Sequence, residues 1–341
     1  MNDRGKLLII RFSAMGDVAM SAPVIKELSN AYPTQELLML SRSAFKPFFS
    51  DISNLQFISF DSKGEHKGFI GLIKLFFELK KQRIFKVADL HNSLRSKVLC
   101  LLFFLIGVKT ISIDKGRSEK KRLTRKHNKE LIPLKLTVSR YADVFSKLGF
   151  AFELKNQLKF VPKIKPIHEY WIGVSPFAQH AQKVYPLTKM ENVLLHLAEL
   201  GYQLYIFGGS IEEEIIANEW ANKHQHITSL VKRMSLAEEL EFISKLDLMV
   251  SMDSSGMHLA SLVNIPVISI WGATHPYAGF LGYGQSISDA VQIDLSCRPC
   301  SIYGNVKCYR GDFACMNNLP EQSVINKVID KLHQHETAIV N

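Results

Sequence analysis

The sequence predicts an α/β protein made of two successive units, each built on a doubly wound parallel sheet. Short aliphatic runs alternate with segments of helical periodicity in both halves of the 341-residue chain. The halves are separated at 161–166, VPKIKP, a short basic stretch with two prolines that is typical of a linker. No G-x-G-x-x-G sequence is present, so the glycine fingerprint of a nicotinamide oxidoreductase is missing. We therefore expect domains at 1–165 and 166–341.

The first half begins with a continuous aliphatic run at 6–12, which predicts a buried parallel strand. A turn at 13–17 leads into a helix that ends near residue 32, and we expect Pro23 to be tolerated only in the first turn of that helix. The other elements expected in this half are strands at 37–40, 57–60, 85–90 and 111–113 and helices at 69–81, up to 105, and at 137–148.

A basic segment at 115–129, KGRSEKKRLTRKHNK, interrupts this pattern with eight Lys or Arg against one Glu. Such a run is either a solvated loop or a surface that recruits phosphate groups. No aromatic residues are interleaved with the charges, so nucleic acid is the weaker interpretation. Assigned to the first domain, the segment favours an acidic glycolipid acceptor, with four candidate contacts at Lys120, Lys121, Arg122 and Arg125.

The second half repeats the alternation of strands and helices. Its expected strands are 170–174, 204–207, 246–250 and 265–270, and its expected helices are 190–200, 211–223, 237–246, 257–262 and 321–335. The last of these helices either stays with the second domain or packs back onto the first.

A polar turn, Asp253-Ser254-Ser255-Gly256, follows the strand at 246–250 and precedes a helix. Ligands of open α/β sheets bind at this edge, because helix N-termini present unpaired N–H groups and a positive dipole end. Gly256 would let a phosphate approach the backbone. The alternative is an ordinary helix cap, since Asp and Ser favour that position. His258, one turn into the helix, is equally a ligand or a packed structural group.

Several motifs resemble the heptosyltransferases, lipopolysaccharide glycosyltransferases of family 9 that take ADP-heptose. They occur in order along 6–320: IIRFSAMGD at 9–17 with Pro23, DLH at 89–91 with Arg95-Ser96, KVYP at 183–186, FGG at 207–209 with Glu212, and DSSGMHLA at 253–260 with Pro266 and WGATHP at 271–276. The resemblance implies a GT-B fold, in which two Rossmann-like domains face a central cleft. It also implies that the first domain binds the acceptor and the second binds the nucleotide-sugar.

The resemblance implies roles for individual residues as well. Asp17 would be the base that takes the proton of the acceptor hydroxyl in an inverting transfer, and Lys183 would offset the charge of the leaving diphosphate. Donor contacts are expected from Ser13, Gly16, Glu212, Asp253, Ser254, Ser255, Gly256 and His258, and acceptor contacts from His91 and Arg95. No cofactor and no catalytic metal would be needed. Structural roles remain open for Asp17, as a helix cap, and for His91 and Arg95, as bridges between loops.

Composition indicates where the protein is located in the cell and what kind of partner it binds. A net charge of +10 and a pI near 9.2 suggest an acidic partner, and the start of the chain lacks the apolar core of a signal peptide. We expect a cytoplasmic protein, peripheral on the inner face of the cytoplasmic membrane. Four clustered cysteines, Cys297, Cys300, Cys308 and Cys315, are either free thiols or a structural zinc site. The function expected is sugar transfer to a lipopolysaccharide core; the alternative is a non-catalytic protein that binds acidic glycolipid or a protein partner.

Overall fold

The computed structural model describes residues 5–162 and 165–340, and the chain forms two compact units. Unit 1 is Met1–Lys115 with Lys135–Asn156, and unit 2 is Gly116–Leu134 with Gln157–Asn341. The chain therefore passes into unit 2 before the linker predicted at 161–166, of which residues 163–164 lie outside the described residues. The segment Gly116–Leu134 also belongs to unit 2, whereas the sequence analysis assigned it to the first domain.

Unit 1 contains a five-stranded parallel sheet in the order β3-β2-β1-β4-β5. Its strands are β1 (Lys6–Ile10), β2 (Leu37–Ser41), β3 (Leu55–Ser59), β4 (Ile84–Asp89) and β5 (Lys109–Ser112). Residues 7–10 of β1 are fully buried because β1 is central and both faces of the sheet are covered. The strand order reverses direction between β1 and β4, where Ile10 pairs with Asp89.

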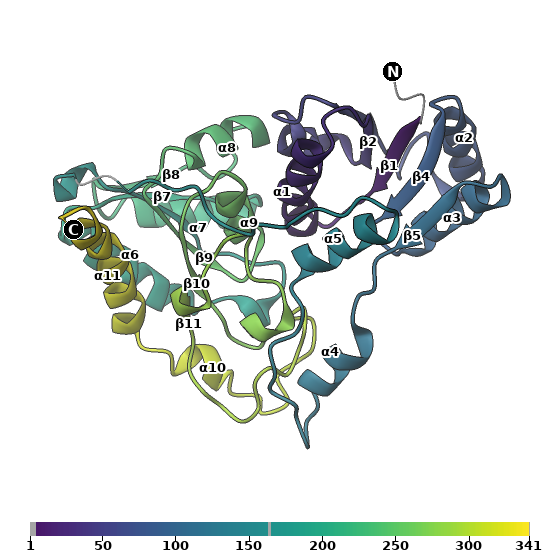
Figure 1. The fold of residues 1–341 in the computed structure, drawn as a ribbon. Coiled ribbons are helices and arrows are strands. Elements are labelled where there is room, and N and C mark those ends of the chain that lie inside the picture. Colours follow the sequence, from purple (N-terminus) through teal and green to yellow (C-terminus); the bar gives the residue numbers. More distant parts are fainter. Residues whose placement is uncertain (1–4, 163–164, 341) are drawn as a thin grey trace. The chain divides into compact units, whose positions relative to one another are not determined.

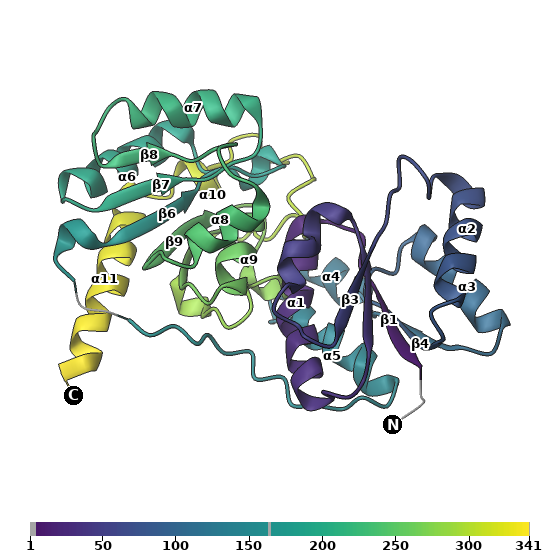
Figure 2. The same cartoon turned by 90° about the horizontal axis from the view of Figure 1, so that it is seen from above.

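Helices cover both faces of this sheet (Figures 1 and 2). α1 (Met15–Ala31) and α5 (Thr137–Lys147) pack together on one face, and α2 (Gly68–Lys80) and α3 (Leu94–Leu105) pack together on the other. A 3-10 helix, η1 (Ser43–Phe49), follows β2. α1 continues through Pro23 at its ninth residue, so our restriction of this proline to the first turn was wrong. The buried face of α1 compensates for the backbone hydrogen bond that Pro23 cannot make.

Unit 2 contains a six-stranded parallel sheet in the order β11-β10-β9-β6-β7-β8. Its strands are β6 (Trp171–Ser175), β7 (Gln203–Ile206), β8 (Ile227–Ser229), β9 (Leu248–Met252), β10 (Val267–Ile270) and β11 (Ala290–Val291). The strand order reverses between β6 and β9, where Ser175 pairs with Ser251. The sheet thus repeats the doubly wound plan of unit 1.

Three helices of unit 2 share one hydrophobic core: α6 (Leu187–Glu199), α7 (Ile211–Ala221) and α11 (Glu321–Val340). α8 (Leu236–Ile243) and α9 (Ser255–Leu262) contact each other, and α9 lies on β9 and β10. The shorter helices are α4 (Arg117–Leu123), α10 (Ala314–Asn317), η2 (Ile167–Glu169), η3 (Ala181–Lys183), η4 (Pro276–Ala278) and η5 (Ile287–Asp289). Val324, Val328 and Leu332 of α11 are buried in this core.

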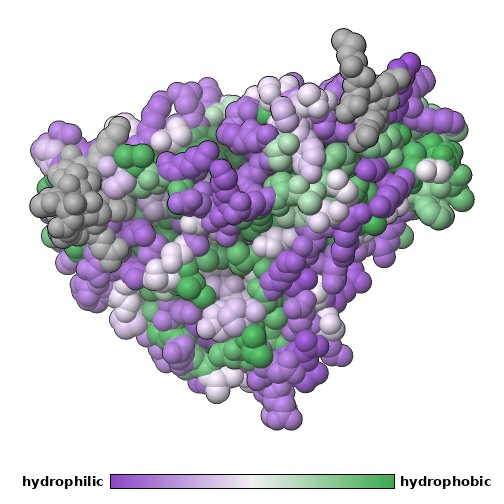
Figure 3. All heavy atoms as spheres, viewed as in Figure 1, coloured by the Kyte–Doolittle hydropathy of each residue, from purple (hydrophilic) through white to green (hydrophobic). Residues whose placement is uncertain are grey.

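The fold class and most elements agree with the sequence analysis to within a few residues. Sequence reasoning missed β8, which has only three residues, and α4, which lies in the segment considered a loop. Apolar side chains also remain on the outer surface of α2 and α3 (Figure 3). No helix in the described part of the chain is long and apolar enough to span a membrane.

Candidate active site

Many of the predicted site residues lie at the carboxyl edge of a sheet, near the point where the strand order reverses, whereas Glu212 follows β7 and the basic residues 120–125 lie on and after α4. In unit 1 the residues at this edge are those that follow β1 and β4, and in unit 2 those that follow β6 and β9. Loops that leave neighbouring strands toward opposite faces open a crevice there, which is the usual ligand site of doubly wound sheets. Each unit therefore has a candidate site of its own.

In unit 1 the site centres on Asp17 in the first turn of α1. Its Oδ2 lies 2.5 Å from Nη2 of Arg11 and 3.4 Å from the backbone N of Ala14. Arg11 is buried and also donates from Nη1 to the carbonyl of Leu90 at 2.7 Å. Burial alone would lower the pKa of Arg11, but Tyr141 and Asp17 outweigh it and the net pKa is raised. The guanidinium thus orients Oδ2, while Oδ1 has no protein partner among the described residues and the side chain is 28% exposed.

His91 lies beside this pair, in the loop between β4 and α3. Its Nδ1 accepts a hydrogen bond from the backbone N–H of Phe12 at 3.3 Å, which leaves Nε2 as the N–H of the neutral ring. Burial, and then the charges of Arg11 and Lys115, lower the pKa of His91 to about 3. The imidazole is therefore neutral at physiological pH and can donate a hydrogen bond to an acceptor hydroxyl.

A buried carboxylate holds the His91 loop in place. Oδ1 of Asp89 accepts the backbone N–H groups of His91 and Asn92 at 2.9 and 2.8 Å, and Oδ2 accepts the hydroxyls of Ser96 and Ser112 at 3.1 and 3.0 Å. The DLH motif thus pairs a structural Asp with a candidate functional His. The sequence analysis quoted Asp89 and Arg11 within its motifs but gave neither residue a role.

Three other predicted residues of unit 1 lie close by in the chain but play different structural parts. Gly16 lies inside the first turn of α1, and the residue that caps this helix is Ala14, so the hydroxyl of Ser13 makes no cap. Arg95 is exposed in the first turn of α3. His91 precedes that helix, so it and Arg95 do not lie on one helix.

In unit 2 the central feature is an ion pair between Lys183 and Asp253. Nζ of Lys183, at the end of η3, lies 3.0 Å from Oδ2 of Asp253, and their side chains are 16% and 7% exposed. Gly304 contacts the Lys183 stem so closely that a Cβ there would lie 2.4 Å from its Cγ. The structure thus brings together two residues that the sequence analysis placed at one nucleotide site from motifs 70 positions apart.

The start of α9 is free of a side-chain cap. Ser254 is the N-cap residue, but its side chain makes no hydrogen bond to the helix, and Ser255 is the first helical residue. The first N–H groups of α9 therefore remain available to an anion such as a phosphate. This geometry argues against the ordinary-cap interpretation of the DSSG turn.

Gly256 and His258 of the same motif are packed residues. A Cβ on Gly256 would lie 2.3 Å from Oγ and 2.4 Å from Cβ of Ser175, so the glycine is required by close packing of α9 on β6. His258 is also buried, which fits the structural interpretation better than direct contact with a ligand. The structure thus gives a packing reason for a glycine at position 256, and the predicted donor contact of Gly256 stays a prediction.

The acidic residues after the FGG motif divide into two roles. Glu213 forms a capping box with Ser210: its Oε2 accepts the backbone N–H groups of Gly209 and Ser210 at 2.7 and 3.1 Å. Glu212 is exposed, and backbone and Ser210 hydrogen bonds lower its pKa. The carboxylate of Glu212 is therefore accessible, and its predicted contact with the donor stays a prediction.

The basic segment is anchored inside unit 2 by its own charges. Lys120 is buried, with Nζ 4.3 Å from the ring centre of Phe280 and 5.8 Å from that of Tyr303. Arg122 donates to Glu130 at 2.7 Å. The contacts of Lys120 explain why the segment belongs to unit 2 and not to the first domain, to which we assigned it. Of the four predicted acceptor contacts, only Lys121 and Arg125 are exposed.

The cysteine loop is held by cations rather than by disulfides. Cys297, Cys300, Cys308 and Cys315 are free thiols around one small cavity. Burial raises the pKa of Cys315 to about 11, and no group of three or more His, Cys, Asp or Glu in the described residues is arranged to hold a metal. Arg298, buried between the first two cysteines, donates to carbonyls of Trp271, Gly272, Thr274 and Ile293 and to the Gln292 side chain. Sequence reasoning missed this arginine.

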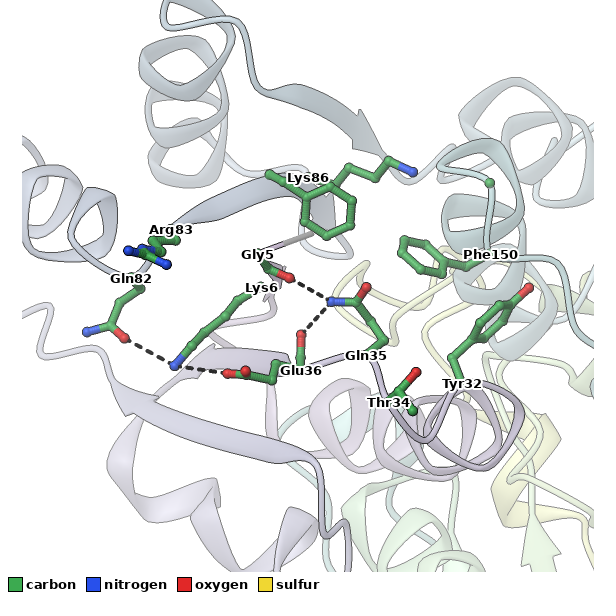
Figure 4. Close-up of a pocket in the computed structure, with 12 residues that line it drawn as sticks. Gly5, Lys6, Tyr32, Thr34, Gln35, Glu36, Gln82, Arg83, Lys86 and Phe150 are labelled. Carbon is green, nitrogen blue, oxygen red and sulfur yellow. Dashed lines mark hydrogen bonds and ion pairs between the residues drawn. The ribbon is translucent and has the colours of Figure 1, made fainter. Parts of the chain in front are cut away.

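A separate cavity of about 250 Å³ opens at the amino-terminal edge of the unit 1 sheet, away from Asp17 (Figure 4). Lys6 lies there with its Nζ 2.9 Å from Gln56, and 3.4 Å from both Gln82 and Glu36. The polar side chains at this cavity thus largely form hydrogen bonds and ion pairs with one another. We assign the cavity no part in the active site.

The chain is similar to known proteins in both sequence and fold. Residues 72–307 match the model of glycosyltransferase family 9 (heptosyltransferase). The chain is 23% identical to the lipopolysaccharide core heptosyltransferase OpsX of Haemophilus influenzae, over 79% of this chain and 80% of that protein. It superposes on the E. coli heptosyltransferase WaaC with ADP with a TM-score of 0.69 and 18% identity, covering 96% and 99% of the two chains. A family 9 glycosyltransferase from Veillonella parvula gives a TM-score of 0.73 with 16% identity, covering 98% and 99%.

The structural similarity confirms the expected GT-B fold, and the family match confirms the resemblance found in the motifs. The matched segment covers more than half of the chain and includes the DLH, KVYP, FGG and DSSG motifs. The protein is thus an enzyme, a glycosyltransferase, and it belongs to glycosyltransferase family 9, the heptosyltransferases.

Proposed function

We propose that the protein transfers heptose from ADP-heptose to a lipopolysaccharide inner-core acceptor with inversion at the anomeric carbon, working at the inner face of the cytoplasmic membrane. Unit 2 binds the nucleotide-sugar, and unit 1 binds the reacting sugar of the acceptor, whose acidic groups are attracted by exposed cations of both units. The support for the substrates is that the relatives named above act on a lipopolysaccharide core or hold ADP.

Asp17 is the proposed base. Its carboxylate accepts the proton of the acceptor hydroxyl as that oxygen attacks the anomeric carbon and the bond to the diphosphate breaks. The observation that carries this role is the geometry of the carboxylate: Arg11 and Ala14 hold Oδ2, and Oδ1 faces partly exposed space. Neutral His91 donates a hydrogen bond that orients the hydroxyl, and exposed Arg95, Lys121 and Arg125 attract the acidic groups of the acceptor.

Lys183 and the first N–H groups of α9 are proposed to bind the diphosphate. Negative charge grows on the leaving diphosphate as the glycosidic bond breaks, and a fixed cation with uncapped N–H groups stabilises that charge. Asp253 holds Lys183 in place, and Glu212 accepts hydrogen bonds from the ribose hydroxyls. The Lys183 ammonium and the dipole of α9 together stabilise the negative charge that a divalent metal stabilises in other transferases. We therefore propose that transfer needs no metal.

The test is a transfer assay with the purified chain, a delipidated lipopolysaccharide core acceptor and a panel of nucleotide-sugars. We expect release of ADP together with an acceptor heavier by one heptosyl residue, unaffected by a chelator. Transfer from a uridine or guanosine donor, with none from ADP-heptose, would overturn the proposed donor. A chelator-sensitive rate that magnesium restores at unchanged melting temperature would overturn the metal-free mechanism.

A further inference from the structure

Exposed apolar side chains are concentrated on one region of unit 1. Among the described residues, eight of the nineteen large hydrophobic side chains that are exposed lie on α2, on α3 or directly after α3. They are Phe69, Ile70, Phe77, Leu94, Leu101, Phe104, Leu105 and Ile106, which we call the α2–α3 patch. Figure 3 shows apolar surface at the end of the molecule where Figure 1 labels these helices. A cluster of this size marks an interaction surface.

α3 has apolar residues on two opposite faces. Leu99 and Phe103 point into the core and are fully buried. Leu94, Leu101 and Leu105 recur with the spacing of a helical stripe, yet they are 80%, 57% and 69% exposed. Packing inside unit 1 does not explain this second stripe, because a helix needs only one apolar face to bind its sheet.

α2 extends the same surface. Phe76 of α2 contacts Phe103 of α3 with ring centres 5.1 Å apart, so the two helices lie side by side. Phe69 and Phe77 of α2 are 62% and 56% exposed on the outer side. Exposed apolar side chains of both helices therefore contribute to the α2–α3 patch.

The α2–α3 patch is bordered by positive charge. Seven basic residues are exposed here: six lie within these helices or at their caps, and the seventh begins β5, four residues after α3; they are Lys67, Lys74, Lys80, Lys81, Arg95, Lys97 and Lys109. Two acidic residues lie among them, Glu78 within α2 and exposed Glu65 three residues before it, and Lys74 lies 4.0 Å from Glu78 and 3.9 Å from Glu65. Lys97 lies three residues after Leu94 and four before Leu101, so it belongs to the outer stripe itself.

We propose that the α2–α3 patch is an interfacial surface that seats unit 1 on an anionic lipid bilayer. Phenylalanine and leucine side chains enter the boundary between headgroups and acyl chains, and the lysine stems extend along them to bring ammonium groups to phosphates. A second copy of the chain fits the same patch poorly. In a two-fold interface the patch meets the identical patch of the other copy, so the seven cations of one copy would face the same seven cations of the other and repel them.

The location of the patch suits the chemistry of the site. α3 begins at the carboxyl edge of the sheet, and Leu94 follows His91 by three residues. Seating this edge at the membrane brings the Asp17 cluster near the headgroup level, where a lipid-linked acceptor presents its sugars; this consequence rests on the proposed function.

The test is co-flotation of the full-length protein with vesicles, without donor or acceptor. One set is phosphatidylcholine alone, and the other contains one third phosphatidylglycerol. The parent should float with the anionic vesicles, bind the neutral ones weakly, and detach as salt rises, because exposed charges are screened. Replacing two outer leucines (Leu101→Gln with Leu105→Gln) should lower the affinity for anionic vesicles by about tenfold or more.

A matched control replaces an equally exposed apolar pair with the same spacing on α7 of unit 2, Ile211→Gln with Ile215→Gln. It should bind as the parent does, and both variants should keep the parent's melting temperature. Equal vesicle binding by the two variants, or no binding by the parent, overturns the proposal. Loss of a parent dimer in the leucine variant, without vesicle binding, would assign the patch to a second copy. Vesicle binding through the patch by a protein that transfers no sugar would refute the proposed function alone.

Discussion

Replacing Lys183 by Met separates the two roles of the Lys183–Asp253 pair. Methionine keeps the alkyl stem that packs on Gly304 but removes the charge, so Asp253, 7% exposed, is left without its cation. Two unit charges 3.0 Å apart attract by about 5 kcal/mol at an effective dielectric constant of 20. Breaking one side of a buried pair costs about 3–5 kcal/mol. Because Lys183 keeps 16% exposure, we expect the lower end, about 3 kcal/mol.

The assay is thermal unfolding of the parent, Lys183→Met, Asp253→Asn, and the double variant. For a unit of this size about 3 kcal/mol corresponds to roughly 6–12 °C in melting temperature. The double variant should recover most of the loss, because it leaves no buried charge unpaired. Additive effects of the two single changes would refute a direct pair.

Calorimetry on the same variants tests the ligand role. Lys183→Met should weaken ADP about tenfold to a hundredfold, since a hydrogen bond to a charged group contributes about 1.5–3 kcal/mol. AMP lacks the second phosphate and should lose much less affinity. Equal losses for ADP and AMP would remove Lys183 from the diphosphate.

Three further predictions concern single features of the structure. Gly256→Ala should destabilise the protein by about 1–3 kcal/mol through overlap with Ser175, and Ser175→Gly in the same chain should restore stability; failure of that rescue would contradict the packing role. The pKa of His91 is about 3 in the folded protein, below its usual 6.5. Between pH 3 and pH 6.5 the folded state therefore binds fewer protons than the unfolded state, and the free energy of unfolding should rise with pH in that range. His91→Gln should flatten that rise in urea titrations at pH 4 and 6.5, and an unchanged slope would exclude His91 as its source. Replacing exposed Lys121 and Arg125 with Gln should raise the KM for a phosphorylated acceptor at low salt and have less effect at high salt, and identical kinetics would make them bystanders.

Most strands and the polar turns after them could be predicted because they depend on local patterns. The aliphatic run that becomes β1 and the apolar residues before Asp253 each identify a buried strand without any knowledge of their partners. The two carboxyl-edge clusters then follow from the rule for doubly wound sheets.

Features that depend on distant contacts could not be predicted. α4 belongs to unit 2 because Lys120 stacks on Phe280 and Tyr303, which lie more than 150 positions further along the chain. Gly256 is required by Ser175, a residue on another strand. Arg11 and Arg298 are buried cations that donate to backbone carbonyls 79 and 27 positions away, at Leu90 and Trp271, and a backbone carbonyl leaves no pattern in the sequence.

The most direct test of the account is the rate of heptosyl transfer by Asp17→Asn with ADP-heptose and acceptor both saturating. The amide keeps the shape of the side chain but accepts no proton, so kcat should fall by about 10²-fold or more. ADP affinity should stay at the parent value, because Asp17 belongs to unit 1 and the groups proposed to hold the diphosphate, Lys183 and the start of α9, belong to unit 2. A variant that transfers heptose at the parent rate would contradict the assignment of Asp17 as the base.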